Sequence, residues 1–173
     1  MVKRKYSAFL SVLCLLLFLS ACSPAAVYRD DRSAAEVLAD VEKAVPSEAG
    51  YRSVEDDYLS PSTFGEDLTL LRSHVTDWAV AVSDRSDSNP DEILVFHVRE
   101  ATPEQLRAVT DAVRRYGESR RARLADYYRM YAPEQLPKLE NLSVKVCGNY
   151  VLLTVLDEGQ TKKAQAAFEQ ALV

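Results

Sequence analysis

The chain has 173 residues with 21 basic and 26 acidic side chains, and 47% of its residues are hydrophobic. After loss of a leader segment, a chain of this length is expected to form one domain of about 140 residues with a single core. The net charge of −5 argues against a nucleic-acid-binding protein, because such proteins neutralise phosphates with an excess of Lys and Arg.

Residues 1–21 are predicted to be a lipoprotein signal peptide. Lys3, Arg4 and Lys5 precede an apolar run over residues 9–19, and this run is too short for a membrane span of roughly twenty residues. The run ends in Leu19-Ser20-Ala21-Cys22, which resembles the bacterial lipobox. In signals of that class a diacylglyceryl group joins the cysteine thiol and cleavage falls just before the cysteine. The alternative is an ordinary signal peptide or an uncleaved anchor in which Cys22 is incidental.

Lipidation at Cys22 would decide where the protein works. Burial of an acyl chain is worth about 0.8 kcal/mol per CH₂, and two chains are enough for stable anchoring. We therefore expect a lipid-anchored protein at the cell membrane, facing the extracellular or periplasmic side. Residues 22–32 would form a lipidated tether that reaches about 35 Å at most, and residues 33–173 would form a single domain. Loss of Lys3, Arg4 and Lys5 leaves 18 basic and 26 acidic residues, a net charge of −8.

The first half of the domain is predicted to hold one helix and two strands. Ser33-Ala34-Ala35-Glu36 has the form of a capping box, and the apolar residues that follow recur at helical spacing until Pro46. Residues 46–70 are expected to form a long connection or a short helix. Residues 74–83 and 92–100 are rich in β-branched and aromatic residues and predict two antiparallel strands joined by a polar loop.

The second half begins with a long predicted helix. Thr102 is its N-cap, Pro103 lies in its first turn and Gln105 completes a capping box. An apolar stripe continues to Tyr131, although Gly117 interrupts it, and Pro133 ends the helix.

A hairpin and a last helix complete the predicted fold. Gly148-Asn149 is typical of a two-residue turn. That register sets Val146 opposite Val151, Val144 opposite Leu153 and Leu142 opposite Val155, all on one face. The last helix is indicated by apolar spacing over residues 164–172. The order α-β-β-α-β-β-α predicts an α+β domain with a four-stranded antiparallel sheet packed with helices.

Four stretches carry a resemblance to a known family. They are PDEILVFHV (90–98), YAPEQLPKLEN (131–141), GNYVLLTVLD (148–157) and a closing AFEQAL. The chain resembles an uncharacterised family of bacterial lipoproteins, domain of unknown function 4358, over roughly residues 34–173. The resemblance implies a single domain behind a lipobox, and it implies no reaction, cofactor or catalytic residue.

Residue types that carry catalysis or bind metals are scarce. The two histidines, His74 and His97, are predicted on neighbouring strands, where Asp77 or Glu100 would be needed to complete a metal site. Ordinary surface or packing histidines fit the sequence better, and no nucleophile elbow, P-loop or glycine-rich dinucleotide motif occurs. Asp87, Asn89 and Asp91 match the first ligand positions of a calcium loop within residues 84–92, but Glu92 and Val98 break that pattern. We therefore predict no cofactor and no metal.

The strongest local charge feature is the basic segment RRYGESRRARL, with arginines that would suit an anionic partner: Arg114, Arg115, Arg120, Arg121 and Arg123. These arginines wrap around the predicted helix, so a solvated helix face is the simpler interpretation. The tyrosines Tyr127, Tyr128 and Tyr131 are likewise expected to pack the helix end rather than stack on a ligand. Cys147 is the third cysteine, and it is expected to pack at a strand end.

We therefore predict a non-enzymatic, lipid-anchored interaction or accessory domain whose partner is an envelope protein or an anionic polymer. Two alternatives stay open. One is an envelope enzyme that uses carboxylates on wall polymer or glycan, which would need two carboxyl groups about 5–10 Å apart in a cleft. The other is a lipoprotein that binds a small ligand or a metal.

Overall fold

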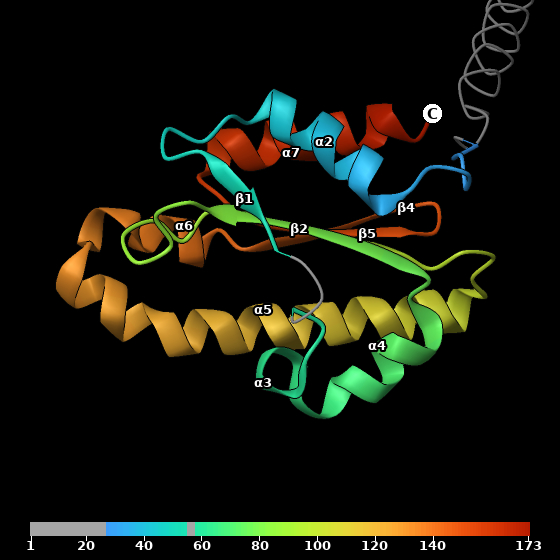
Figure 1. Ribbon diagram of the computed structural model, residues 1–173, viewed down its shortest axis with the longest axis horizontal. Helices are drawn as coiled ribbons and strands as arrows, with labels where there is room; N and C mark the ends of the chain where they lie inside the picture. The colour runs from blue at the N-terminus through green and yellow to red at the C-terminus, as the bar shows by residue number, and fades with distance from the viewer. Residues whose placement is uncertain (1–26, 55–57) are drawn as a thin grey trace, which may run out of the picture.

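The computed structural model describes residues 27–54 and 58–173, which form an antiparallel sheet between two layers of helices (Figure 1). The five strands lie in the order β1-β2-β3-β5-β4. Their bounds are Tyr51–Ser53 for β1, Asp77–Ser83 for β2, Glu92–His97 for β3, Ser143–Cys147 for β4 and Tyr150–Val155 for β5. The mixed α and β character and the antiparallel pairing confirm the predicted class.

The prediction of four strands was wrong, because the segment 46–70 contributes the edge strand β1. Tyr51, Arg52 and Ser53 pair antiparallel with Ser83, Val82 and Ala81 of β2. Three residues are too few to show an alternating pattern of apolar and polar side chains, so only pairing with β2 reveals the strand. The same segment also contains the short helix α3 (Pro61–Phe64), a 3₁₀ turn (Gly65–Asp67) and the start of α4 (Leu68–His74).

Each face of the sheet has its own helices. Helices α2 (Ala34–Ala44) and α7 (Glu158–Ala171) cover one face, and the long α5 (Pro103–Tyr131) crosses the other beside α3 and α4 (Figure 1). A 3₁₀ turn (Pro133–Gln135) and α6 (Leu136–Glu140) follow α5 at one end of the sheet. Across the described residues, every helix is too short or too polar to span a bilayer.

The predicted helix starts are confirmed. Ser33 and Thr102 cap α2 and α5, and both capping boxes form, with Glu36 and Gln105 bonding back to the backbone of the cap residue. These contacts satisfy N–H groups that the first helical turn leaves without partners. Helix α5 continues to Tyr131, as its apolar stripe predicts.

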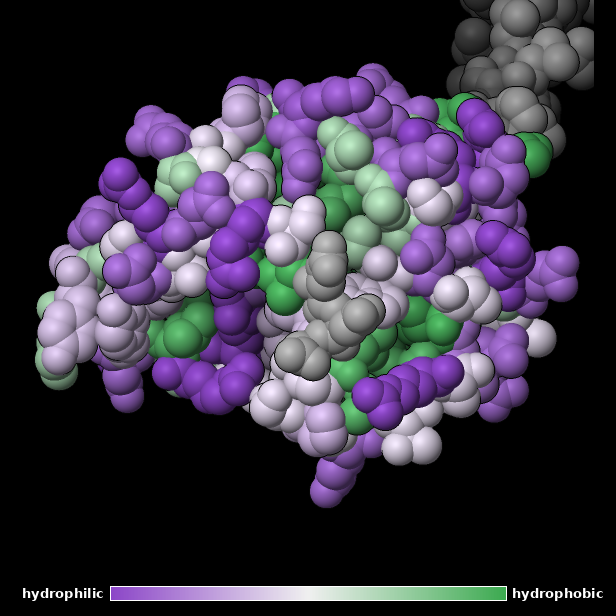
Figure 2. Space-filling model, viewed as in Figure 1, coloured by the Kyte–Doolittle hydropathy of each residue, from purple (hydrophilic) through white to green (hydrophobic). Residues whose placement is uncertain are grey.

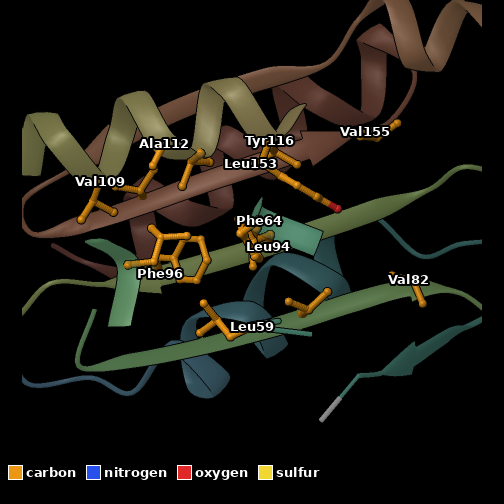
Figure 3. Close-up of a cluster of buried hydrophobic side chains, with 14 of the residues drawn as sticks. Leu59, Phe64, Val82, Leu94, Phe96, Val109, Ala112, Tyr116, Leu153 and Val155 are labelled. Carbon is orange, nitrogen blue, oxygen red and sulfur yellow. The ribbon is translucent and has the colours of Figure 1, made fainter. Parts of the chain in front are cut away.

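Two apolar cores lie on opposite faces of strands β3 and β5, both of which are buried along their whole length. Leu94, Phe96 and Leu153 face α5, where Figure 3 shows them opposite Val109 and Tyr116. The alternate residues Ile93, Val95 and Leu152 face α2 and α7. Because neighbouring side chains on a strand point to opposite faces, one strand supplies both cores.

The predicted register of the β4–β5 hairpin is confirmed. Val146 pairs with Val151 and Val144 pairs with Leu153, whereas the predicted pair of Leu142 with Val155 is not formed, because β4 begins at Ser143. The turn glycine, Gly148, has a φ of 54°. The α5 face of the hairpin is largely buried, but Val146 near the turn keeps 37% of its surface exposed.

Gly117 allows close packing between α5 and the hairpin. A Cβ atom at this position would lie 2.7 Å from Leu142 Cδ2 and 3.2 Å from Leu153 Cδ1. The glycine weakens the helix locally by about 1 kcal/mol relative to alanine, and it lets α5 approach the sheet.

Gly148→Ala is expected to destabilise the protein by about 1–2 kcal/mol, because an L-residue is strained at positive φ and its Cβ would lie 2.7 Å from Tyr28 Cβ. The matched control is Gly159→Ala in the first turn of α7, where the nearest atom to the new Cβ is 3.4 Å away. The control should be neutral or slightly stabilising. Urea denaturation measures both variants, and equal effects would contradict the proposed role of Gly148.

Candidate functional site

The basic segment of α5 directs its arginines to different sides of the helix. Arg114 and Arg115 are exposed, and they pair with Asp111 (3.0 Å) and Asp67 (2.6 Å). Arg121 and Arg123 are also exposed, and neither forms an ion pair with any described residue. Surface ion pairs such as the first two contribute little to stability. Four of the five predicted arginines are therefore presented to solvent.

Arg120 is the exception, because it points into the protein. Its side chain is 19% exposed, and its Nε contacts Oε2 of Glu92, whose side chain is fully buried. The Nε–H is not directed at the oxygen as in a hydrogen bond, so charge attraction holds this pair. Arg120 is thus mostly buried, unlike the other four arginines, and is already paired within the protein.

Two tyrosines complete the surroundings of Glu92. The Tyr116 hydroxyl donates to Glu92 Oε1 at 2.7 Å, and the Tyr58 hydroxyl contacts the same oxygen and the Tyr116 hydroxyl. Burial, followed by the charge of Glu92, raises the pKa of both tyrosines. Burial works to lower the pKa of Arg120, but the interactions with Glu92 and with the neighbouring tyrosines together outweigh it and raise that pKa. Burial and the neighbouring carboxylate therefore keep both tyrosine hydroxyls protonated.

The exposed arginines line two separate grooves on either side of α5. Arg115 and Arg123 line one of about 320 Å³ that α3 and the following turn close. Arg114 and Arg121 line another of about 210 Å³ with Glu118, Leu142 and Val144, beside the edge strand β4. The basic segment therefore forms two sites of different shape instead of one continuous patch.

The acidic loop before β3 is paired with a lysine side chain of the same protein. Lys138 Nζ lies 2.7 Å from Asp91 Oδ1 and donates to Asn89 Oδ1 at 3.0 Å. Two of the three residues that match a calcium loop are thus engaged by an ammonium group. Tyr127 and Tyr128 donate to backbone carbonyls of Asp87 and Ser86, so these tyrosines attach the loop to the end of α5.

His97 binds the segment that precedes the first helix. Its ring is fully buried, stacks on Tyr150 at a centroid distance of 4.1 Å, and lies 2.7 Å from Asp30 Oδ1 through Nε2. The carboxylate of Asp30 also accepts from the backbone N–H of Glu100 (3.1 Å) and from Asn149 Nδ2 (2.9 Å). His74 lies at the end of α4, and the described residues contain no cluster of three side chains suited to a metal.

Further contacts bind the same segment to the domain. The Arg29 N–H donates to the Leu172 carbonyl at 2.7 Å, and the Tyr150 hydroxyl donates to the Arg32 carbonyl at 2.7 Å. Arg32 reaches the carbonyl of Ala171 and the carboxylate of Asp40. Residues 29–32, predicted to belong to the tether, are therefore packed against the domain.

The cysteines divide between described and undescribed parts of the chain. Cys147 is buried at the end of β4, as expected for a packing residue, and burial raises the pKa of its thiol. Cys22, the predicted lipidation residue, lies outside the described residues, as does the predicted signal peptide.

An apolar groove of about 410 Å³ lies between α2 and strands β1 and β2. Leu38, Trp78 and Val80 form part of its wall, and hydrophobic side chains are visible on this face in Figure 2. Glu42 is its one ionisable lining residue among those described, and burial raises the pKa of this carboxyl group. The groove offers no pair of carboxylates.

Sequence reasoning missed the roles of Glu92 and Asp30. A carboxylate at the start of an otherwise apolar strand was a usable signal for Glu92, because a buried charge needs a partner. Its partner Arg120 is 28 residues away on a helix, and the spacing along the chain does not reveal the contact. Asp30 carries no local signal, since it is one of several charged residues before Ser33.

Comparison with known proteins identifies the family. The model of the domain of unknown function DUF4358 matches residues 62–156, which is more than half of the chain. The chain belongs to the DUF4358 family. The matched region extends from α3 to the end of β5 and includes Glu92, Arg120 and all the exposed α5 arginines. No curated protein and no solved structure matches the chain.

Arg120→Met is expected to destabilise this DUF4358 domain by about 3–5 kcal/mol, because it leaves the buried carboxylate of Glu92 without its counter-charge. Arg121→Met is the matched control and should change stability by no more than about 0.5 kcal/mol. Adding Glu92→Leu to Arg120→Met should restore most of the loss. Chemical denaturation measures all three, and similar values for Arg120→Met and Arg121→Met would disprove the structural role.

Asp30→Asn is expected to lower stability at pH 7 by about 1–2 kcal/mol, because charge-assisted hydrogen bonds are lost. Partial burial works to raise the pKa of Asp30, but the bonds from His97, Glu100 and Asn149 outweigh it and lower that pKa. A carboxyl group whose pKa is lower in the folded than in the unfolded protein stabilises the fold. This stabilisation is fully present when the pH is above the unfolded-state pKa of about 3.9, and it is lost as the pH falls through the folded-state pKa. Thermal melts from pH 7 to pH 2 should show the two proteins converging only below about pH 4; a constant difference would contradict this linkage.

Proposed function

We propose that this protein is a lipid-anchored, non-catalytic accessory domain on the outer side of a membrane, where exposed arginines of α5 bind an anionic partner. The observation that carries the proposal is the presence of two exposed guanidinium groups, Arg121 and Arg123, without a carboxylate partner among the described residues. Arginine suits this role because its planar fork donates several hydrogen bonds to a carboxylate or phosphate.

The packed N-terminal segment supports a short connection to the membrane. If Cys22 carries the lipid, only residues 23–28 separate it from Arg29, whose N–H bonds to the C-terminal end of α7. Six residues extend about 20 Å at most, so the domain would stay close to the bilayer.

The direction of α5 supports a partner located away from the bilayer. Helix α5 begins at the end of the domain near the N-terminal segment and runs to the opposite end (Figure 1). Arg121 and Arg123 lie in the second half of this helix. A domain anchored through Cys22 would therefore present them farther from the membrane than the start of the helix.

The state of the buried carboxylates supports a binding role over a hydrolytic one. Glu92 is paired with Arg120, and Asp91 is paired with Lys138. A glycosidase needs one carboxyl group that holds a proton and another that acts as nucleophile or base. Each of these two carboxyl groups is instead occupied by a cation of the chain itself.

In-cell crosslinking of the full-length protein tests the proposal. The double variant Arg121→Glu with Arg123→Glu should reduce the yield of the principal crosslinked neighbour at least fivefold, because the local charge is reversed. The matched control Lys162→Glu with Lys163→Glu changes charge equally on α7, on the opposite face of the sheet, and should leave the yield unchanged. Equal yields from both double variants would refute arginine binding.

The anchor is tested in the same cells with Cys22→Ala. This variant should fail to incorporate labelled fatty acid and should leave the membrane fraction or persist as precursor. Continued normal lipid labelling would refute Cys22 as the lipidation site, independently of the result for the arginines.

A further inference from the structure

The outer edge of strand β4 is open. Within residues 27–54 and 58–173, β4 pairs with β5 on one side and with no strand on the other. Cys147 and Tyr150 flank a two-residue turn, so they form a hydrogen-bonded pair of the hairpin. By alternation, the backbone N–H and C=O groups of Val146 and Val144 point away from β5.

Of the features that commonly protect edge strands, β4 carries one, a lysine, and this Lys145 is paired with Glu169 of α7 at 2.6 Å. The five residues of β4, Ser143–Cys147, include no proline. They pair one to one with residues of β5, so the strand has no β-bulge. Val146 is 37% exposed and adds an apolar contact next to the free backbone groups. Exposed edges of this kind accept an extended segment through main-chain hydrogen bonds.

The charges beside the edge indicate which segment fits. The groove that runs next to β4 is lined by Arg114 and Arg121 of α5, with Glu118 between them. Arg114 is engaged by Asp111 in an exposed pair, which leaves Arg121 as the unpaired cation of the described surface there. At physiological salt, charges beyond about 8 Å are largely screened, so these groups matter more to a bound segment than the net charge of the chain.

A second copy of the chain fits this edge poorly. The antiparallel register that joins both Val144 and Val146 to a symmetry-related β4 sets Lys145 opposite Lys145. Like charges directly opposite each other on a sheet are destabilising.

We propose that β4 binds an extended acidic segment of a partner protein, which adds a sixth strand to the sheet and directs carboxylates to Arg121 and Arg114. This inference rests on the proposed function and specifies its partner as a polypeptide. Main-chain hydrogen bonds from Val144 and Val146 would supply affinity. Side chains at alternate positions of the segment would meet the arginines on the α5 face, since the side-chain period of a strand is two residues.

The test uses the full-length protein in detergent and a labelled seven-residue peptide with glutamate at alternate positions and valine or threonine between them. Fluorescence anisotropy should show saturable binding, and amide hydrogen exchange at Val144 and Val146 should slow on peptide addition. N-methylation of the peptide nitrogens that would face β4 keeps the charge of the peptide and removes its main-chain hydrogen-bond donors. This change should weaken binding at least about tenfold. A peptide with lysine in place of glutamate should bind at least tenfold more weakly.

Variants of the protein locate the site. Val146→Pro removes an N–H that the β4–β5 ladder does not use, and should abolish strand addition while the protein stays folded by circular dichroism. Arg121→Glu should weaken peptide binding at least fivefold. Arg123→Glu, on the other groove, is the matched control and should stay within about twofold of the unmodified protein.

The outcomes separate this inference from the proposed function. If peptide binding is insensitive to N-methylation and to Val146→Pro but sensitive to Arg121→Glu, strand addition is overturned. That result would leave only charge recognition by the arginine, which is the behaviour expected for an anionic polymer as partner. No binding of the acidic peptide also overturns strand addition, while the crosslinking yield judges the proposed function separately. A dimer in analytical ultracentrifugation that Val146→Pro abolishes would make a second copy the occupant and overturn the inference.

Discussion

Burial of strand β3 on both faces is the constraint on which the other parts of this structure depend. Its six residues are all buried, so its neighbours must include a strand on each side and helices above and below. The strand begins with a carboxylate, Glu92, which has no access to water. A buried charge is tolerated only with a counter-charge and hydrogen-bond donors, and α5 supplies them through Arg120 and Tyr116. The rotation of α5 about its axis is therefore coupled to the position of this carboxylate.

The orientation of α5 then decides which arginines are free to act. Because Arg120 turns inward, the other arginines of the basic segment lie on the two flanks of the helix. Arg115 and Arg123 lie on one flank, and Arg114 and Arg121 lie on the other. One flank meets α3 and the other meets the open edge of β4. The cluster that stabilises the core thus also sets the two grooves apart, and it gives each groove a different kind of neighbour: a short helix on one side and unpaired backbone groups on the other.

Several elements were predictable from the sequence because their signals are local. The caps at Ser33 and Thr102, the turn at Gly148 and the register of Val146 opposite Val151 each depend on residues that are near one another in the chain. Strand β1 and the pairing of His97 with Asp30 were not predictable, because their partners lie 28 or more residues away. The same reason explains why Arg120 was grouped with its exposed neighbours: its partner Glu92 is on another element, and composition alone does not distinguish an inward arginine from an outward one.

The sequence by itself determined the periodic helices, the two hairpin strands and the basic character of α5, since these follow from side-chain spacing over a few turns. It also supplied the hypothesis of lipidation at Cys22, through four consecutive residues. Only the tertiary structure decided that five strands form the sheet, that residues 29–32 pack on the domain, and that Arg120 is buried while Arg121 is exposed. Those features arise where segments distant in the chain compete for the same buried space, and the lowest-energy pairing of charges and backbone groups is settled only after the layers have packed.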